Sequence, residues 1–189
     1  MGRIVVTEFV SLDGVVEDPG GAEDYKYGGW SFEYSRGDDG DKFKLDETMD
    51  SEALLLGRVT YEGFADAWPS REGEFADKFN NMPKYVVSTT LSDPEWTNST
   101  VIAGDLGEGV ARIKDEVDGD VVVHGSATLV QSLQGTGLID EYRFLVEPFI
   151  MGRGRRFFAE GTAMSKLRLV ESKTLSSGTL ALIYQPLAP

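Results

Sequence analysis

Short, wholly apolar runs alternate with stretches of helical spacing through the first two thirds of this sequence. The clearest runs are A-L-L-L at 53–56 and V-V-V at 121–123, and a glycine follows each within two residues. A strand without polar positions needs cover on both faces, which is typical of a parallel sheet with helices on either side. Strands that alternate with helices in this way predict an α/β fold with right-handed crossovers.

The last third of the sequence has a different pattern. Residues 139–147 and 166–175 alternate polar and apolar side chains, and Ser176-Ser177-Gly178 predicts a turn before a final strand. We therefore expect a mostly parallel central sheet flanked by helices, with an antiparallel C-terminal hairpin, in one domain over residues 1–189. The strands expected before the hairpin lie at 4–10, 53–56, 84–89, 100–102 and 120–123, and the expected helices at 41–50, 60–68, 106–117 and 129–133.

A long loop is expected between the first strand and the first helix. Residues 18–40 are rich in glycine, aspartate and aromatic side chains, and loops of this length in a compact domain are usually functional or mobile. The short helix that follows at 41–50 is expected to turn Phe43 and Leu45 toward the core.

The charge balance and the rarity of two residue types exclude several kinds of site. The 18 basic and 32 acidic side chains give a formal net charge of −14, and such a surface repels nucleic-acid backbones and anionic lipids. There is no cysteine and one histidine, His124, which excludes disulfides, thiol nucleophiles and Cys- or His-rich metal sites. The sequence shows neither a signal peptide nor an apolar run of the roughly 20 residues that span a membrane, so we expect a cytoplasmic protein.

Small or hydroxyl residues follow three of the expected strands, in the segments Gly57-Arg58-Val59-Thr60, Ser88-Thr89-Thr90 and Gly125-Ser126-Ala127. Ligands of open α/β sheets bind beyond the carboxyl ends of the strands, where helix N-termini offer free N–H groups to phosphate. Glycine lets the backbone approach closely, and an arginine such as Arg58 can grip a phosphate with two hydrogen bonds. The structural alternative is that the glycines form tight turns and that Thr60 and Ser126 are helix caps. The dinucleotide and P-loop glycine motifs are missing.

Several strings together resemble a known family. They are S-L-D-G at 11–14, L-L-L-G-R-V-T-Y at 54–61, Y-V-V-S-T-T at 85–90, V-V-V-H-G-S-A at 121–127, G-L-I-D-E-Y at 137–142 and P-F-I-M-G-R-G-R-R-F-F at 148–158. In this order they resemble the dihydrofolate reductase-like fold, and in particular a stand-alone form of the reductase domain at the C-terminus of the bifunctional deaminase-reductase of riboflavin biosynthesis. They span nearly the whole chain and are more specific for the fold than for a substrate.

The resemblance implies NADPH as the cofactor. The positions that match the family's cofactor-binding residues are Gly57, Arg58, Thr60, Ser88, Thr89, Gly125, Ser126 and Ala127. Among them, Ser88 and Thr89 match the strand end that contacts the adenosine 2′-phosphate, and Gly125 begins the turn over the pyrophosphate. Relatives often carry two adjacent glycines in that turn. Here the first is His124, which either crowds the cofactor or has a structural or peripheral part.

Two aspartates are candidate acids of the reaction, which needs a proton as well as a hydride. Asp13, in S-L-D-G, matches a family motif at the mouth of the site, and its alternative reading is a turn residue. Asp41 is the nearest counterpart of the acid that dihydrofolate reductases carry on their first helix, and its alternative reading is a helix cap.

Two further residues are candidates for binding the substrate. Trp30, with Phe32, would stack on a flat heterocycle or would pin the loop. Arg153, with Arg155 and Arg156, would bind a sugar phosphate at the rim of the site, or would form a strand-end turn with solvated charges.

The favoured hypothesis is an NADPH-dependent reductase of a pyrimidine-, pteridine- or flavin-like substrate, resembling the reductase of 5-amino-6-(5-phosphoribosylamino)uracil. Two alternatives on the same fold are dihydrofolate reduction and a non-catalytic nucleotide-binding module. A hydrolase is disfavoured because the sequence lacks G-x-S-x-G and nearly lacks histidine. Relatives commonly form homodimers through the C-terminal part of the sheet, so we expect a homodimer.

Overall fold

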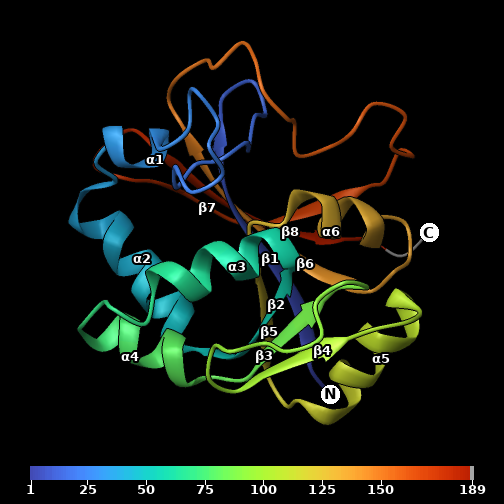
Figure 1. The fold of residues 1–189 in the computed structure, drawn as a ribbon. Coiled ribbons are helices and arrows are strands. Elements are labelled where there is room, and N and C mark those ends of the chain that lie inside the picture. The colour runs from blue at the N-terminus through green and yellow to red at the C-terminus, as the bar shows by residue number, and fades with distance from the viewer. Residues whose placement is uncertain (188–189) are drawn as a thin grey trace.

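The apolar runs form the centre of an eight-stranded sheet in the computed structural model, which describes residues 1–187 (Figure 1). The strand order is β4-β3-β2-β5-β1-β6-β8-β7. The strands are β1 (Arg3–Ser11), β2 (Ser51–Gly57), β3 (Lys84–Val87), β4 (Ser99–Ile102), β5 (Asp120–His124), β6 (Ile139–Glu147), β7 (Leu167–Thr174) and β8 (Leu180–Pro186). The helices are α1 (Trp30–Glu33), α2 (Gly37–Met49), α3 (Arg58–Ala67), α4 (Glu74–Asn81), α5 (Leu106–Glu116) and α6 (Ala127–Leu133).

The strands from β4 across to β6 pair in parallel, and β8 pairs antiparallel with both β6 and β7. This confirms the expected mostly parallel sheet with an antiparallel C-terminal hairpin. Among residues 1–187, no helix has both the length and the apolar character that a membrane span requires.

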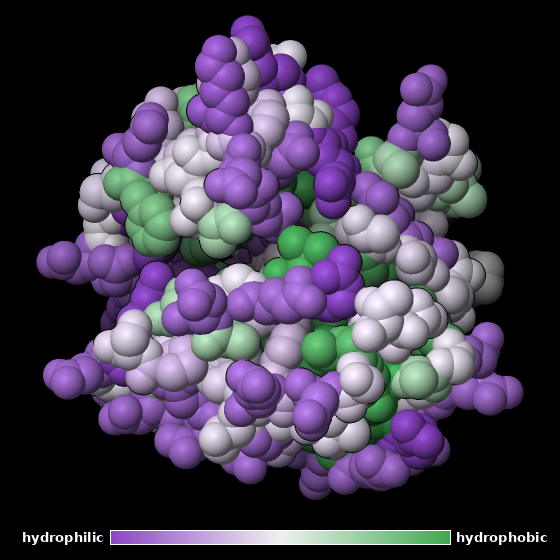
Figure 2. All heavy atoms as spheres, in the orientation of Figure 1, coloured by the Kyte–Doolittle hydropathy of each residue, from purple (hydrophilic) through white to green (hydrophobic). Residues whose placement is uncertain are grey.

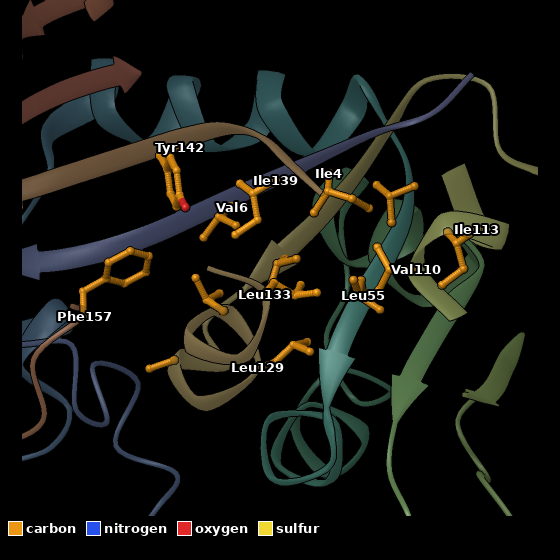
Figure 3. Close-up of a cluster of buried hydrophobic side chains, with 14 of the residues drawn as sticks. Ile4, Val6, Leu55, Val110, Ile113, Leu129, Leu133, Ile139, Tyr142 and Phe157 are labelled. Carbon is orange, nitrogen blue, oxygen red and sulfur yellow. The ribbon is translucent and has the colours of Figure 1, made fainter. Parts of the chain in front are cut away.

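Two apolar clusters, one on each face of the sheet, explain the unbroken apolar runs. Leu55 of β2 packs into the cluster that includes residues of α5 and α6 (Figure 3). Its neighbours Leu54 and Leu56 pack on the other face with residues of α3 and α4. Because side chains of a strand alternate between faces, a strand covered on both sides has no position at which a polar residue reaches water.

Four elements differ from expectation. Helix α2 begins at Gly37 and buries Lys44, Glu47 and Thr48, whereas Phe43 and Leu45 are only partly buried. The short helix α1 interrupts the expected loop, and α4 lies in a stretch for which no element was expected. Strand β3 ends at Val87, so the two residues that follow lie outside the sheet.

Two loops far apart in the sequence are joined above the sheet. The first follows β1 over residues 12–29 and the second follows β6 over 148–166 (Figure 1). Backbone hydrogen bonds link Val16 N to Arg155 O and Phe157 N to Gly14 O, both near 3 Å (2.9 and 3.0 Å). We call these two segments the paired loops.

Candidate functional site

The carboxyl ends of β1, β2 and β5 border a cavity of about 800 Å³. Residues of β1 line it, together with the starts of α3 and α6, parts of α2 and α4, and the first of the paired loops. Its size falls within the range of small-molecule sites, and its position is the one expected for an open α/β sheet. Figure 2 shows a mainly hydrophilic face with a hollow between the upper loops and the layer that contains α3 and α6.

Two strand-to-helix turns meet at one end of the cavity. The Gly57 N–H donates to Ser126 Oγ at 2.9 Å, which ties the β2–α3 turn to the β5–α6 turn. Gly125 and Ser126 have φ angles of 63° and 60°, in the left-handed region that favours glycine. The structure brings six of the expected cofactor residues together on the cavity wall here: Gly57, Arg58, Thr60, Gly125, Ser126 and Ala127.

The helices at these turns begin without side-chain caps. Gly57 is the N-cap of α3 and Ser126 that of α6, and neither caps its helix through a side chain. Uncapped N–H groups at the positive end of the longer helix, α3, are available to an anion. The alternative interpretation of Thr60 as a helix cap is wrong, because Thr60 lies inside the first turn of α3.

Arg58 lies at the start of α3 and is engaged by a neighbour on the same helix. Its Nη1 is 2.7 Å from Glu62 Oε2, and the two side chains are 43% and 49% exposed. Exposed pairs of this kind contribute little to stability. Arg58 can therefore exchange Glu62 for a phosphate at small cost.

The other two expected cofactor residues follow β3 and do not line the cavity. Ser88 Oγ accepts hydrogen bonds from Thr90 N at 3.1 Å and Leu91 N at 2.9 Å, so its hydroxyl closes a local turn. Thr89 is exposed. The contact of Ser88 and Thr89 with a cofactor stays a prediction.

Asp13 joins the paired loops and is absent from the cavity lining. Its carboxylate accepts hydrogen bonds from Ser11 Oγ at 2.7 Å and from Met151 N and Gly152 N at 2.9 Å. Desolvation raises the pKa of Asp13, but these hydrogen bonds outweigh it and leave the pKa below its usual value. The geometry gives Asp13 a structural task, and its catalytic role stays a prediction.

Asp41 and Trp30 also lie outside the cavity lining. The Asp41 side chain is 66% exposed and pairs with Arg36 Nη2 at 2.9 Å. The helix-cap interpretation of Asp41 is wrong, because α2 begins at Gly37. Trp30 is 3% exposed and donates from Nε1 to Glu17 O, so it pins the loop, whereas Phe32 lines the cavity.

The three arginines of the second paired loop have separate partners. Arg153 lies over the Tyr27 ring at 4.7 Å and donates to the Tyr27 hydroxyl. Arg156 donates to the Asp13 carbonyl. Arg155 lines the cavity and donates to Thr128 Oγ1 at 3.2 Å, so it is the one of the three placed to meet a ligand.

An aromatic wall closes the side of the cavity formed by α3 and α4. Its rings pack against one another, with centroids 5.2 Å apart for Trp68 and Phe75 and 4.6 Å apart for Trp68 and Phe79. Such a surface suits a flat aromatic or heterocyclic ring. We define the aromatic wall as Phe64, Trp68, Phe75 and Phe79.

Glu8 of β1 is a cavity residue that the sequence did not single out. Its side chain is 5% exposed, and Oε1 is buried without a hydrogen-bond partner in the described part of the chain. Desolvation raises the pKa of Glu8 to about 8, against the opposing charge of Lys44 and with a smaller contribution from Glu23. The only signal was a glutamate inside the β-branched run I-V-V-T-E-F-V.

His124, at the end of β5, lines the cavity and packs edge-on against Phe79 with ring centroids 5.3 Å apart. Desolvation lowers the pKa of His124 well below its usual value, and the charges of Lys44 and Arg143 act in the same direction. The imidazole is therefore neutral at physiological pH.

The fold has close counterparts of known structure. It is similar to a putative riboflavin biosynthesis protein from Shewanella sp. PV-4, with a TM-score of 0.78 and 17% identity over 98% of this chain and 99% of that one. It is also similar to dihydrofolate reductase from Enterococcus faecalis complexed with NADP(H) and RAB-propyl, with a TM-score of 0.59 and 15% identity over 98% and 97% of the two chains. The dihydrofolate reductase-like fold is thereby confirmed.

Sequence comparison points the same way. The uncharacterized protein YyaP of Bacillus subtilis (strain 168) is 26% identical over 188 residues, which cover 96% of this chain and 94% of YyaP. The RibD C-terminal domain family matches residues 3–181, and these include the β1 strand, both joined turns and the second paired loop. This chain is a member of the RibD C-terminal domain family.

Proposed function

We propose that this protein is an NADPH-dependent reductase of a flat nitrogen heterocycle of the pyrimidine, pteridine or flavin kind. The observation that carries the proposal is that one cavity is bordered both by two joined strand-to-helix turns and by the aromatic wall. The turns suit the phosphates of a dinucleotide and the wall suits a flat ring. Membership of the RibD C-terminal domain family supports a reductase.

The residues at the joined turns fit the cofactor. The uncapped start of α3 and the Arg58 guanidinium supply donors and positive charge for phosphate. Gly125 has a φ of 63°, a conformation that favours glycine, and its lack of a side chain lets a ligand approach this turn closely. When bound, NADPH supplies a hydride, and the residues of the chain bind its phosphates, orient its ring and exclude water.

The proposed substrate is based on the structural counterparts and on Arg155. One structural counterpart is a putative riboflavin biosynthesis protein and another is a dihydrofolate reductase that binds NADP(H). Arg155, on the cavity wall, offers a guanidinium to a sugar phosphate. We therefore place 5-amino-6-(5-phosphoribosylamino)uracil first among the substrates to test, followed by dihydrofolate, pteridines and flavins.

The test is a titration of the purified protein with NADPH and, in parallel, with NADH, followed by fluorescence or calorimetry. We expect tight and NADPH-selective binding. Absence of binding of either cofactor at millimolar concentration would overturn the proposed function.

Two variants of one ion pair sharpen this test. Arg58→Ala should weaken NADPH binding by about 1.5–3 kcal/mol, the usual contribution of a charge-assisted hydrogen bond. Glu62→Gln removes the residue that competes for Arg58 and should strengthen binding by about 0.3–0.5 kcal/mol. Arg112→Ala on α5, which breaks another exposed i,i+4 pair, is the matched control and should change nothing. Equal losses for NADPH and NADH in Arg58→Ala would assign Arg58 to the pyrophosphate instead of the 2′-phosphate.

A further inference from the structure

Glu8 occupies a place in β1 where the sheet otherwise presents apolar side chains. Strand alternation puts it on the same face as Ile4, Val6 and Val10, which belong to one core cluster. Its neighbour Thr7 pairs with His124, the last residue of β5. Glu8 therefore lies just beyond the end of β5, where the sheet gives way to the cavity.

The carboxyl group of Glu8 is buried without a partner. Its side chain is 5% exposed and lines the cavity, and no hydrogen bond to it is present among residues 1–187. An unpaired polar group in such a place carries a substantial cost, so its presence calls for a reason. A carboxylic acid that must meet a ligand inside the cavity is such a reason.

We propose that Glu8 is the proton donor of the reduction, an inference that rests on the proposed function. The substrate carries a C=N or C=O double bond against the cofactor. The carbon receives the hydride from NADPH, and the Glu8 carboxyl gives its proton to the nitrogen or oxygen. The products are the reduced substrate, NADP⁺ and a Glu8 carboxylate, which water reprotonates before the next cycle.

The surroundings of Glu8 keep it in the form that the step requires. Burial raises its pKa to about 8, Lys44 on α2 opposes this, and Glu23 on the first paired loop adds to it. At neutral pH the group is therefore mostly a neutral acid with a proton to give. The other titratable or charged groups that line the cavity are Glu17, Asp18, Arg36, Arg58, Arg71, Glu72, His124 and Arg155.

The other carboxylates considered for this role are already occupied. Asp13 accepts hydrogen bonds from Ser11 of β1 and from Met151 and Gly152 of the second paired loop, and Asp41 is an exposed partner of Arg36. Glu47 accepts from Lys44 and Thr7. Glu8 alone among these four combines burial, a free carboxyl group and a position on the cavity wall.

The first test is the protonation state of Glu8, which needs neither cofactor nor substrate. The infrared spectrum of the wild-type protein at pH 7 should contain a protonated-carboxyl C=O band that Glu8→Gln lacks. This band should fade as the pH rises through about 8. A Glu8 that is already a carboxylate at pH 7 would overturn the proposal, whatever the outcome of the cofactor titration.

The second test separates Glu8 from the cofactor site. With a probe that the wild type reduces, such as dihydrofolate, Glu8→Gln should bind NADPH within about twofold of the wild type while its turnover falls about 10²–10⁴-fold. Glu23→Gln removes a nearby negative charge that raises the pKa of Glu8, so the alkaline limb of its pH–rate profile should move to lower pH. Unchanged turnover and an unchanged pH profile in Glu8→Gln would refute the assignment. A wild type that binds no NADPH would refute the proposed function instead. The infrared measurement of Glu8 protonation would not be affected, because it needs no cofactor.

Discussion

Two carboxylates near the carboxyl end of β1 lie in opposite environments. Asp13 accepts three hydrogen bonds, one from Ser11 and two from the second paired loop, whereas the Glu8 carboxyl accepts none from residues 1–187. Hydrogen bonds to the charged form outweigh desolvation at Asp13 and lower its pKa, whereas desolvation dominates at Glu8 and raises its pKa. The same chemical group therefore serves as a charged clamp at one position and as a neutral acid at the other.

The clamp at Asp13 is testable by Asp13→Asn. The amide can replace only one of the two oxygens, so a backbone donor of Met151 or Gly152 loses its acceptor, and we expect a loss of about 1–3 kcal/mol in the free energy of unfolding. Urea unfolding measures this loss, and Asp93→Asn, at an exposed position, is the control.

The same variant should change how stability depends on pH. The native pKa of Asp13 is below its unfolded value, so its contribution is present above about pH 4 and is lost as the pH falls through the lower native pKa. The difference between wild type and Asp13→Asn should therefore shrink below about pH 4. A difference that stays constant down to pH 2 would show that the carboxylate charge is irrelevant.

At the scale of the element, α2 packs against the sheet through charged side chains. Lys44 donates to Thr7 Oγ1 at 2.9 Å and forms a buried ion pair with Glu47, and Arg143 of β6 lies 3.6 Å from the same Glu47. The expectation that Phe43 and Leu45 turn toward the core was met only in part, since both are half-buried and Phe43 packs against a small core cluster. The most buried long side chains of α2 are charged, so its inner face could not be recognised from apolar residues.

Removing one member of this buried pair should be costly. Glu47→Leu leaves Lys44 buried without its counter-ion, so we expect a loss of about 3–5 kcal/mol of unfolding free energy. The double variant Lys44→Met/Glu47→Leu removes both charges and should recover part of that loss. On the same helix, Lys42→Met breaks an exposed pair with Asp46 and should cost under about 0.5 kcal/mol. Equal losses from the buried and exposed variants would contradict this account.

The elements that could be predicted are those that neighbouring elements bury, because burial requires apolar residues that can be recognised in the sequence. β2 and β5 are apolar because both faces are buried, and α5 shows its inner face at Val110 and Ile113. Helix α4 was not predicted because it is only eight residues long and starts after Gly73 without a capping side chain. At the site, strand ends and their glycines were predictable because parallel strands end at one edge. Glu8 was not, because its isolation depends on residues brought together by folding.

At the scale of the whole molecule, the C-terminal hairpin leaves one edge of the sheet uncovered. The outermost strand, β7, is largely exposed, and its pairing with β8 shifts register between Leu169 and Glu171. Such a bulge at an edge disfavours further strand pairing. Leu169 and Leu180 lie on the same face of the hairpin and are 49% and 38% exposed. We propose that a second copy of the chain packs against this face.

The homodimer should be visible by light scattering or sedimentation at micromolar concentration. Each copy carries a net charge of −14, so association should strengthen as salt shortens the Debye length from about 10 Å at 0.1 M to about 3 Å at 1 M. Leu169→Lys should give a monomer, and Met49→Lys, an equal change of charge at an exposed site on α2, should not. A wild type that is monomeric at every salt concentration would refute the dimer.

The paired loops have a mechanical consequence for the cavity. Asp13 spans them, with its partners Met151 and Gly152 lying 138 and 139 positions further along the chain, and Val16 and Phe157 add backbone bonds between them. A displacement of one loop is thus transmitted to the other. We therefore expect the paired loops to move together, and proteolytic cleavage of either loop to loosen both.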